Sequence, residues 1–371
     1  MVDYIGTARL RELVSRTGLA RLIEELSREI EADYRRWDDF DKSPRHAIHS
    51  PGGVIELMPT SDGRLYSFKY VNGHPRNTAK KLLTVTAFGV LADVATGYPL
   101  LLSEMTFVTA LRTAAMSALA ACRMARPASR VMALIGNGAQ SEFQAIAFHR
   151  MMGIRHLRLY DTDPQATSKL MRNLASLRLA DLEVTRCAST AEAVRGADIV
   201  TTATADKRNA TILTPDMIEP GMHLNAVGGD CPGKTELHAD IVRAKDVRIV
   251  VEFEPQARIE GEIQQLDAPG HEVPRHEVPE GVDVPRRRVI EFADVVRGKL
   301  PGRANEREVT LFDSVGFALN DFSALRYLQR LNAEQPDGGE RIDLIPDLDD
   351  PKDLYMGLGP ERAAARRRRV A

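Results

Sequence analysis

A buried strand that runs into a glycine turn and then into a helix, within residues 130–152, constrains the fold more than any other feature. The strand and turn lie in RVMALIGNGAQ, the helix in SEFQAIAFHRMM, and a second strand in HLRLYDTD. Further strand-like runs, alternating with helical or turn segments, are LEVTRCA, DIVTTAT, HLNAVGG and VRIVVE. This alternation predicts an α/β fold with a Rossmann-type, doubly wound parallel sheet that has helices on both faces.

The turn GNGAQS has the glycine spacing of a dinucleotide-binding loop. Gly136 and Gly138 permit a tight turn and a close approach of a pyrophosphate to the helix N-terminus. The third position of the pattern holds Ser141 where glycine or alanine is expected, so the motif alone is weak evidence. Asp161 ends the next strand, where its carboxylate can bind a ribose 2′-hydroxyl and would repel a 2′-phosphate. This favours NAD over NADP; the alternative is that Asp161 only begins a turn in YDTDP.

The chain on either side of this sheet predicts a second, discontinuous unit. Residues 7–36 place apolar and charged positions at helical spacing, which indicates one amphipathic helix or two. Short β-rich runs follow up to YPLLLSEM, with ATG as a hairpin turn, and then a helix of small residues at 106–125. Near the other end, EVTLFDSVGFALNDFSALRYLQ predicts a strand that enters a long amphipathic helix. We expect an α+β domain from residues 1–125 and 316–371, and a nucleotide-binding domain at 126–315.

A segment near residues 266–288 interrupts the α/β pattern. It repeats HEVP, is dense in proline and glycine, and lacks apolar runs, which predicts a surface loop insertion. His271 and His276 could bind a metal there, but a plain loop is the favoured interpretation, and we predict no metal site.

Composition narrows the class of protein. The net charge of −2 gives no field that would recruit nucleic acid, and the basic run RAAARRRRV (362–370) is interpreted as a solvated or partner-contacting tail. No stretch approaches eighteen apolar residues, so no membrane span is expected, and the first residues lack the apolar core of a signal peptide. Cys122, Cys187 and Cys231 are far apart, which suits a reducing cytoplasm.

Three cations stand out in the first unit. Lys69 lies in a strand between Phe68 and Tyr70, so alternation places it on the face opposite to these aromatic rings. Arg45 precedes a glycine pair, and Arg112 lies in a helix of small, apolar residues, where a guanidinium needs a phosphate or carboxylate partner. Each could be an ordinary ion-pair partner, but together they suit a carboxylate substrate. The residues alone therefore predict an NAD-dependent enzyme that acts on a small acid.

The segment NAVGGDCPGKTEL (225–237) raises a separate question, because it puts Asp230 directly after two glycines at the end of a predicted strand. Asp230 is either a turn residue or a carboxylate placed for chemistry beside the cofactor.

Seven motifs together resemble the ornithine cyclodeaminase/mu-crystallin family, in order over nearly the whole chain: FKYVNGHPRN, GNGAQSEF, LYDTD, NAVGGDCPGKTEL, EGEIQQL, VTLFDSVGFAL and IDLIPDLDDPKDLY. The resemblance implies a Rossmann domain and a substrate-binding, oligomerising domain made from both chain ends. It also implies NAD as a recycled cofactor, an amino-acid substrate, and a homodimer or higher homo-oligomer. The segment near 266–288 departs from the family pattern.

The resemblance also implies roles for individual residues. Asp230 matches the catalytic acid/base. The positions that match substrate contacts are Arg45, Glu56, Lys69, Arg112 and Val315, with Glu56 as a candidate partner of the distal amine. The positions assigned to the cofactor are Thr84, Arg112, Gly136, Gly138, Ala139, Gln140, Asp161, Thr202, Asn225, Ala226, Val227, Gly228, Lys234 and Ser314.

The reaction that the resemblance implies converts L-ornithine to L-proline and ammonia. NAD accepts a hydride from Cα, the distal amine closes a five-membered ring on the resulting imine, ammonia leaves, and the hydride returns. The glycine pair would let the backbone pass close to the nicotinamide, so that Asp230 reaches the reacting nitrogens. Alternatives are lysine as the substrate, giving L-pipecolate, an imine reductase or amino-acid dehydrogenase on the same fold, and a binding protein without activity. A pure binding protein would have no need of Asp230.

Overall fold

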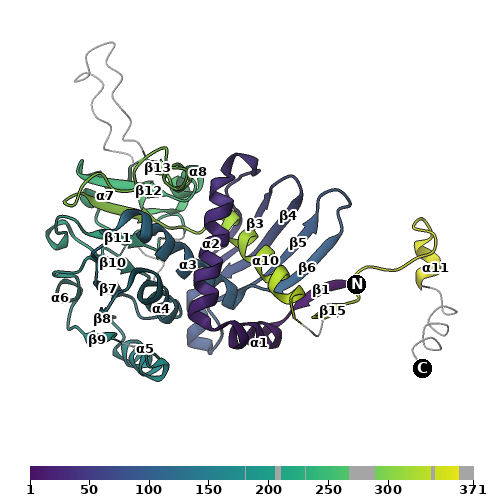
Figure 1. Ribbon diagram of the computed structural model, residues 1–371, viewed down its shortest axis with the longest axis horizontal. Coiled ribbons are helices and arrows are strands. Elements are labelled where there is room, and N and C mark those ends of the chain that lie inside the picture. The colour runs from purple at the N-terminus through teal and green to yellow at the C-terminus, as the bar shows by residue number, and fades with distance from the viewer. Residues whose placement is uncertain (180, 205–209, 230, 267–288, 336–338, 359–371) are drawn as a thin grey trace, which may run out of the picture.

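The computed structural model describes residues 1–179, 181–204, 210–229, 231–266, 289–335 and 339–358. The strands of this part of the chain form two sheets, which lie on opposite sides of a layer of helices (Figure 1). We call them the parallel sheet and the mixed sheet.

The parallel sheet has the strand order β13-β12-β14-β11-β10-β7-β8-β9, and every neighbouring pair is parallel. Its strands are β7 (Val131–Ile135), β8 (His156–Tyr160), β9 (Glu183–Arg186), β10 (Ile199–Thr202), β11 (His223–Ala226), β12 (Val247–Val251), β13 (Ile290–Glu291) and β14 (Val309–Asp313). Its helices are α4 (Ser141–Met152), α5 (Pro164–Leu177), α6 (Thr190–Val194), α7 (Ala239–Arg243), α8 (Glu254–Glu260) and α9 (Phe292–Val296), with short 3₁₀ turns η3 (Pro215–Met217) and η4 (Glu262–Leu266). The strand order reverses at β7, which lies between β8 and β10. Ligands of such sheets bind outside the carboxyl ends of the strands at this reversal.

The mixed sheet has the order β15-β1-β6-β5-β4-β3-β2, in which β1 and β6 are parallel and the other neighbours antiparallel. Its strands are β1 (Val2–Ile5), β2 (His46–Ser50), β3 (Gly53–Ser61), β4 (Leu65–Gly73), β5 (Val85–Asp93), β6 (Pro99–Glu104) and β15 (Glu340–Ile342). The accompanying helices are α1 (Thr7–Thr17), α2 (Leu19–Arg35), α3 (Thr106–Met124), α10 (Ala318–Ala333) and α11 (Leu354–Leu358), with 3₁₀ turns η1 (Trp37–Asp39) and η2 (Pro75–Lys80).

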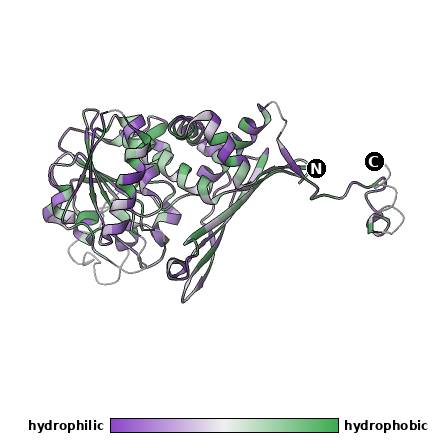
Figure 2. Cartoon of the chain, turned by 90° about the horizontal axis from the view of Figure 1, so that it is seen from below, coloured by the Kyte–Doolittle hydropathy of each residue, from purple (hydrophilic) through white to green (hydrophobic). Residues whose placement is uncertain are grey.

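The two faces of the mixed sheet differ in what covers them. On β4 the inward residues Ser67, Lys69 and Val71 are buried and face α10, as the alternation predicts. The opposite face, which we call the outer face, exposes Ile48, Ile55, Leu57 and Phe88 on β2, β3 and β5, and Tyr70 stacks on Phe88 at 5.1 Å. Figure 2 shows this sheet edge-on, with helices on one side only.

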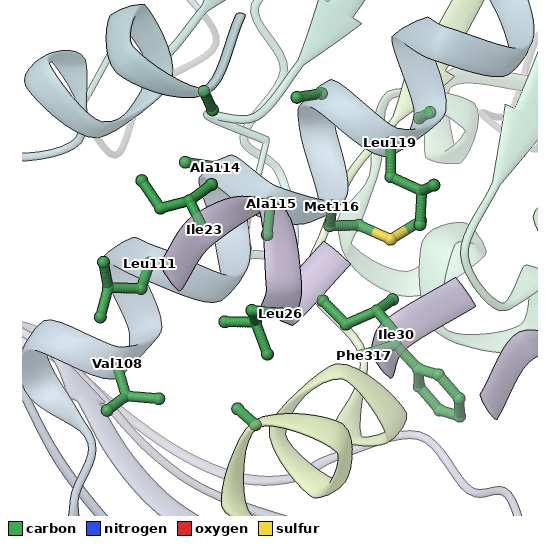
Figure 3. Close-up of a cluster of buried hydrophobic side chains, with 14 of the residues drawn as sticks. Ile23, Leu26, Ile30, Val108, Leu111, Ala114, Ala115, Met116, Leu119 and Phe317 are labelled. Atoms are coloured by element: carbon green, nitrogen blue, oxygen red, sulfur yellow. The ribbon is translucent and has the colours of Figure 1, made fainter. Parts of the chain in front are cut away.

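The core between the sheets is built from α2 and α3. Ile23, Leu26 and Ile30 recur on one face of α2 at helical spacing and pack against α3, as Figure 3 shows. Small residues such as Ala114 and Ala115 on α3 let the neighbouring helices come close. The same apolar cluster extends to Phe148 on α4 and to Phe317 before α10, so it joins the two sheets.

The helix at 318–333 differs from the expected amphipathic helix. α10 is buried on most of its surface, including the polar side chains of Asn320, Asp321 and Ser323. These polar groups are tolerated inside because each has at least one hydrogen-bond or ion-pair partner, which offsets part of the cost of burying it. The charge of Asp321 therefore belongs to an internal contact, whereas Arg330, near the end of the same helix, is exposed.

Other expectations have different outcomes. Residues 7–36 form two helices, α1 and α2. The predicted helix of small residues is α3, and the predicted strand, glycine turn and helix are β7, the turn that follows it, and α4. Strands β1 and β15, at one edge of the mixed sheet, were not predicted. The main part of the predicted insertion and the basic tail lie outside the described residues, and the division into domains at 125/126 and 315/316 stays a prediction. Within the described part of the chain, no helix is long and apolar enough to cross a membrane.

Candidate active site

The glycine turn after β7 lies against the end of β10. Gly136 has φ +89°, and a Cβ added there would lie 2.6 Å from the carbonyl oxygen of Ala203, so the close approach requires glycine. A Cβ added at Gly138 would meet no atom of the described residues within 4 Å, so these residues leave space beside the turn. The turn therefore brings backbone to the carboxyl ends of β7 and β10 and leaves room for a ligand.

Ser141 has an internal role at the third position of the glycine motif. It is the first residue of α4, is fully buried, and donates from Oγ to the carbonyl oxygen of Gly136 at 3.0 Å. A glycine or alanine would fit the space but would lose this hydrogen bond. The serine that departs from the usual pattern thus links the first residue of α4 to the glycine turn through its hydrogen bond.

Asp161 follows β8 and holds two backbone groups. Its Oδ2 accepts from the N–H of Asn137 at 2.5 Å, and its Oδ1 accepts from the N–H of Asp163 at 2.7 Å. An ionised carboxylate has about four acceptor sites, so a ribose hydroxyl can still bind. Asp161 therefore shapes the turn whether or not it also binds a ribose, and its contact with the cofactor stays a prediction.

Three buried polar atoms near these strand ends have no hydrogen-bond partner among the described residues: Gln140 Oε1, Thr202 Oγ1 and Asn225 Oδ1. Gln140 precedes α4, Thr202 ends β10, and Asn225 lies in β11. Buried polar atoms are nearly always satisfied, and leaving one unpaired costs about 1–3 kcal/mol. A ligand with hydroxyl and amide groups would satisfy them, so the residues present fit a dinucleotide such as NAD.

The remaining cofactor candidates divide between the two sheets. Ala139 lies in the glycine turn, and Ala226, Val227 and Gly228 follow one another at the end of β11. Ser314 and Val227 donate backbone hydrogen bonds to Ala226 and Thr202, respectively, and Lys234 Nζ donates to the carbonyl of Thr204 at 3.0 Å. Thr84, by contrast, precedes β5 in the mixed sheet.

Lys69 and Arg112 share one buried carboxylate. Asp321 on α10 lies with Oδ2 2.7 Å from Lys69 Nζ and with Oδ1 3.1 Å from Arg112 Nε. All three residues are at least nine-tenths buried. The structure thus brings together two predicted substrate residues from β4 and α3, and supplies a carboxylate that sequence reasoning missed.

Burial and, to a smaller extent, the nearby Arg112 guanidinium lower the pKa of Lys69 to about 8, while Asp321 opposes both effects. An ammonium with a pKa near 8 is still mostly protonated at neutral pH. It can therefore bind an anion and can also give up a proton at modest cost.

Arg45 holds a second cluster. Its Nη1 donates to Glu56 at 3.0 Å, its Nε lies 3.1 Å from a carboxylate oxygen of Glu260, and its Nη2 donates to the carbonyl oxygens of Val315 and Gly316, each at 2.6 Å. Glu56, expected near the distal amine, is thus an ion-pair partner of Arg45 here. Val315 contributes its carbonyl to the same cluster.

Glu252 supports the segment between these clusters. Its carboxylate accepts from the N–H of Gly316 at 2.6 Å and from Asn320 Nδ2 at 2.5 Å, and burial raises its pKa. Ser314, at the start of the same segment, is bound to Ala226 of β11. The segment 314–317 therefore connects the predicted cofactor residues with the predicted substrate residues.

Asp230 lies outside the described residues, while its neighbours Gly228, Gly229 and Cys231 are buried. Elsewhere in the described chain, no three His, Cys, Asp or Glu side chains are grouped as they would be to hold a metal ion. The site offers cations for a carboxylate, carboxylates for an amine, and unpaired polar atoms for a dinucleotide. Sequence reasoning missed Asp321, Glu252 and Glu260; in the sequence Asp321 lies close to Asn320 and Ser323, so it looks like part of the polar side of an amphipathic helix.

Comparison with known proteins gives one consistent answer. The family model described as ornithine cyclodeaminase/mu-crystallin matches residues 9–335. An ornithine cyclodeaminase of Brucella suis biovar 1 (strain 1330) is 56% identical over 357 residues, which cover 96% of this chain and 93% of that protein.

Two solved structures extend the likeness to the fold. A lysine cyclodeaminase, studied for its recognition of L-lysine, L-ornithine and L-2,4-diaminobutyric acid, is 26% identical with a TM-score of 0.82, and the match covers 97% of this chain and 98% of that one. An archaeal alanine dehydrogenase dimer with bound NAD is also 26% identical, with a TM-score of 0.79, and the match covers 93% of this chain and 99% of that one.

Proposed function

The chain belongs to the ornithine cyclodeaminase/mu-crystallin family, and from this premise we propose that it converts L-ornithine to L-proline and ammonia with NAD as a recycled cofactor. The observation that carries the proposal is the pairing of buried cations with buried carboxylates at one site: Lys69 and Arg112 with Asp321, and Arg45 with Glu56 and Glu260. A diamino acid carries a carboxylate and two amines, so it needs both kinds of partner. A site for a simple acid would need only the cations.

The predicted dinucleotide residues support NAD as the cofactor. Gln140, Thr202 and Asn225 offer unpaired buried oxygens, Gly136 and Gly138 offer backbone and space, and Asp161 disfavours a 2′-phosphate. Bound there, NAD supplies a hydride acceptor at the start of the reaction and a hydride donor at its end. This redox-neutral use makes the enzyme an ammonia-lyase and not a net dehydrogenase.

The cations bind and orient the substrate carboxylate. Arg112 uses Nε for Asp321, so its Nη1–Nη2 edge can face a carboxylate in a bidentate pair. Lys69, on β4 of the mixed sheet, supplies a second positive charge. Arg45 supplies a third, beside the segment 314–317, where it binds the carbonyl oxygens of Val315 and Gly316. Fixing the carboxylate from several directions would hold Cα in place while the ring closes, which is the condition for a fast intramolecular attack.

In this proposal, carboxylate side chains bind the amines of the substrate and transfer protons to and from them. Glu56 and Glu260 would attract the distal ammonium, and Asp230 would take and return protons at the reacting nitrogens. A positioned proton-transfer group contributes typically about 10²–10⁴-fold to a rate. The departure of ammonia requires a proton, and ring closure releases one, so one carboxylate can serve both steps.

The test of this function uses a trace of NAD⁺ with a large excess of L-ornithine. We expect stoichiometric L-proline and ammonia without accumulation of reduced cofactor, and L-ornithine deuterated at Cα should give L-proline that keeps the label. One reduced cofactor per substrate would instead assign a dehydrogenase. The same assay with L-lysine decides the substrate, because one methylene is worth only about 1–3 kcal/mol of discrimination.

A homodimer and a cytoplasmic location complete the proposal. The outer face presents exposed apolar side chains on β2, β3 and β5, with Tyr70 of β4 between them, and monomers rarely expose such patches, so a second copy of the chain is a suitable partner. Cys122 and Cys187 are free thiols, which suits a reducing compartment.

A further inference from the structure

Glu236 lies buried directly beneath the glycine pair that precedes Asp230. Its Oε2 accepts from the N–H of Gly228 at 3.0 Å, and its Oε1 accepts from the N–H and Oγ1 of Thr204 at 2.7 and 2.5 Å. Gly228 follows β11 and Thr204 follows β10. One carboxylate therefore ties together the ends of two adjacent strands at the edge where the cofactor is predicted to bind.

The glycines are required by this carboxylate and by a second one. A Cβ added at Gly228 would overlap the Glu236 carboxylate, and a Cβ added at Gly229 would lie 3.1 Å from Glu262 Oε1. The sequence suggested that the glycines make room for the nicotinamide. The structure adds a reason within the protein, because both glycines rest on buried acidic side chains.

Glu262 in turn fixes the backbone of Glu236. Its Oε1 accepts from the N–H of Glu236 at 2.7 Å, and its Oε2 accepts from the N–H of Leu237 at 3.2 Å. On the other side, Lys234 Nζ donates to the carbonyl of Thr204. The segment that follows Asp230 thus folds back under the segment that precedes it, and the two are joined through carboxylate–amide hydrogen bonds.

We propose that Glu236 is a positioning residue for Asp230: through Gly228 and Thr204 it sets the path of the backbone that carries the Asp230 carboxylate, with Glu262 holding Glu236 in place. The proposal rests on the proposed function, in which Asp230 moves protons. Carboxylate–amide hydrogen bonds are among the stronger ones, and a displacement of about 1 Å at a reacting group can cost about 10²-fold in rate. Glu236 therefore acts on the chemistry without touching the substrate.

Glu236→Gln tests the idea with little change of shape. The amide can accept at one end only, so it keeps either the Thr204 or the Gly228 contact and places an N–H against the other. We expect kcat to fall by at least about 10-fold, while KM for ornithine and the affinity for NAD⁺ change less than about threefold, since misplacement affects the transition state more than binding. Amide hydrogen exchange in the peptide 225–235 should become faster. If the glutamine variant does not fold, Glu236→Asp, one methylene shorter, serves the same test.

A control and a double variant separate positioning from a general loss of structure. Asp198 also accepts hydrogen bonds from two backbone N–H groups, those of Arg130 and Val131, at 2.8 and 3.0 Å. It lies at the amino ends of β7 and β10, whereas Glu236 binds at the carboxyl ends of β10 and β11. Asp198→Asn should lower the melting temperature and leave kcat nearly unchanged. Because Glu236 acts through Asp230, the double variant D230N/E236Q should be no slower than D230N alone.

The outcomes are distinct. A Glu236→Gln enzyme with normal kcat, a double variant whose losses multiply, or an equal loss of kcat in Asp198→Asn would each overturn the positioning role while leaving the reaction assignment intact. Near-normal turnover by Asp230→Asn would instead remove Asp230 from the proposed function.

Discussion

Asp161, directly after β8, accepts a 2.5 Å hydrogen bond from the backbone N–H of Asn137 in the glycine turn after β7. The same carboxylate therefore has two roles: it supports the turn that would bind a pyrophosphate, and it is the group predicted to bind the ribose. Any change of Asp161 acts on both features, so a test needs a variant that keeps the geometry.

Asp161→Asn keeps the size and one acceptor oxygen but removes the negative charge. We expect weaker NAD⁺ binding and a smaller preference over NADP⁺, because the repulsion of a 2′-phosphate is lost. Titration with each cofactor, followed by protein fluorescence, measures the ratio of affinities. Asp163→Asn is the matched control, since Asp163 caps α5 through the N–H of Gln165 at 2.9 Å and should not alter the ratio. If the ratio of affinities is unchanged in Asp161→Asn, Asp161 does not contact the ribose.

Asp313, at the end of β14, predicts how stability depends on pH. Burial, with a smaller contribution from the nearby Glu252 carboxylate, raises its pKa to about 7, although hydrogen bonds from the backbone of Glu262 and Ile263 oppose the rise. An acid whose pKa is higher in the folded protein than in the unfolded chain stabilises the fold below the unfolded value of about 4. This contribution is then lost as the pH rises from about 4 to about 7.

Asp313→Asn cannot ionise, so it should stabilise the protein at pH 8 relative to the parent and have little effect at pH 4. A gain of about 1 kcal/mol would raise the melting temperature by about 1 °C in a chain of this length. Differential scanning calorimetry at the two pH values gives the comparison. A variant that is less stable than the parent at pH 8 would show that the ionised form of Asp313 is favoured in the fold.

The parts of the fold that the sequence predicts best are those with local causes. The strand from Val131, the glycine turn and the helix from Ser141 follow from consecutive residues, because buried strands, positive φ and helix periodicity are short-range signals. Strands β1 and β15 were missed because they have only four and three residues, and their pairing joins opposite ends of the chain. Such pairing leaves no local pattern.

The site divides in the same way. The sequence marks Lys69 and Arg112 as unusual, since a cation in an apolar setting needs a partner, but it does not say which carboxylate supplies it. Asp321 is about 250 residues from Lys69 and looks like the polar side of an amphipathic helix. The partners of Asp321 can be identified only from the fold, in which the mixed sheet and α3 bury α10. The glycine pair was noticed, while Glu236 beneath it was not.

The outer face predicts an oligomer that a single charge can disrupt. Phe88 is 43% exposed and stacks on Tyr70 near the middle of this face. Phe88→Glu would place a carboxylate inside an apolar interface, so we expect the dimer to dissociate or weaken. Leu177→Glu is the control, because Leu177 is 44% exposed but lies on α5, far from the outer face in the fold. Sedimentation velocity over a range of concentrations reports the state, and a Phe88→Glu dimer as tight as the parent would exclude this face.

The last prediction concerns the link between Lys69 and Asp321, which are 2.7 Å apart. Burial and Arg112 lower the pKa of Lys69 to about 8, and Asp321 is the group that opposes them. Asp321→Asn should therefore lower this pKa further. If protonated Lys69 binds the substrate carboxylate, kcat/KM falls as the pH rises through the pKa, and in the variant this fall begins about one pH unit lower, the low end for a close opposite charge.

The pH profiles of the parent and the variant are compared with the same substrate, so the titration of the ornithine amines is common to both. Asp33→Asn is a suitable control, because Asp33 is also fully buried and paired, with Ser323 and Arg326, but makes no contact with Lys69. It should lower the melting temperature without moving the alkaline limb. If Asp321→Asn and Asp33→Asn give the same profile, the alkaline limb does not report Lys69, and the lysine does not bind the substrate as the charged partner of its carboxylate.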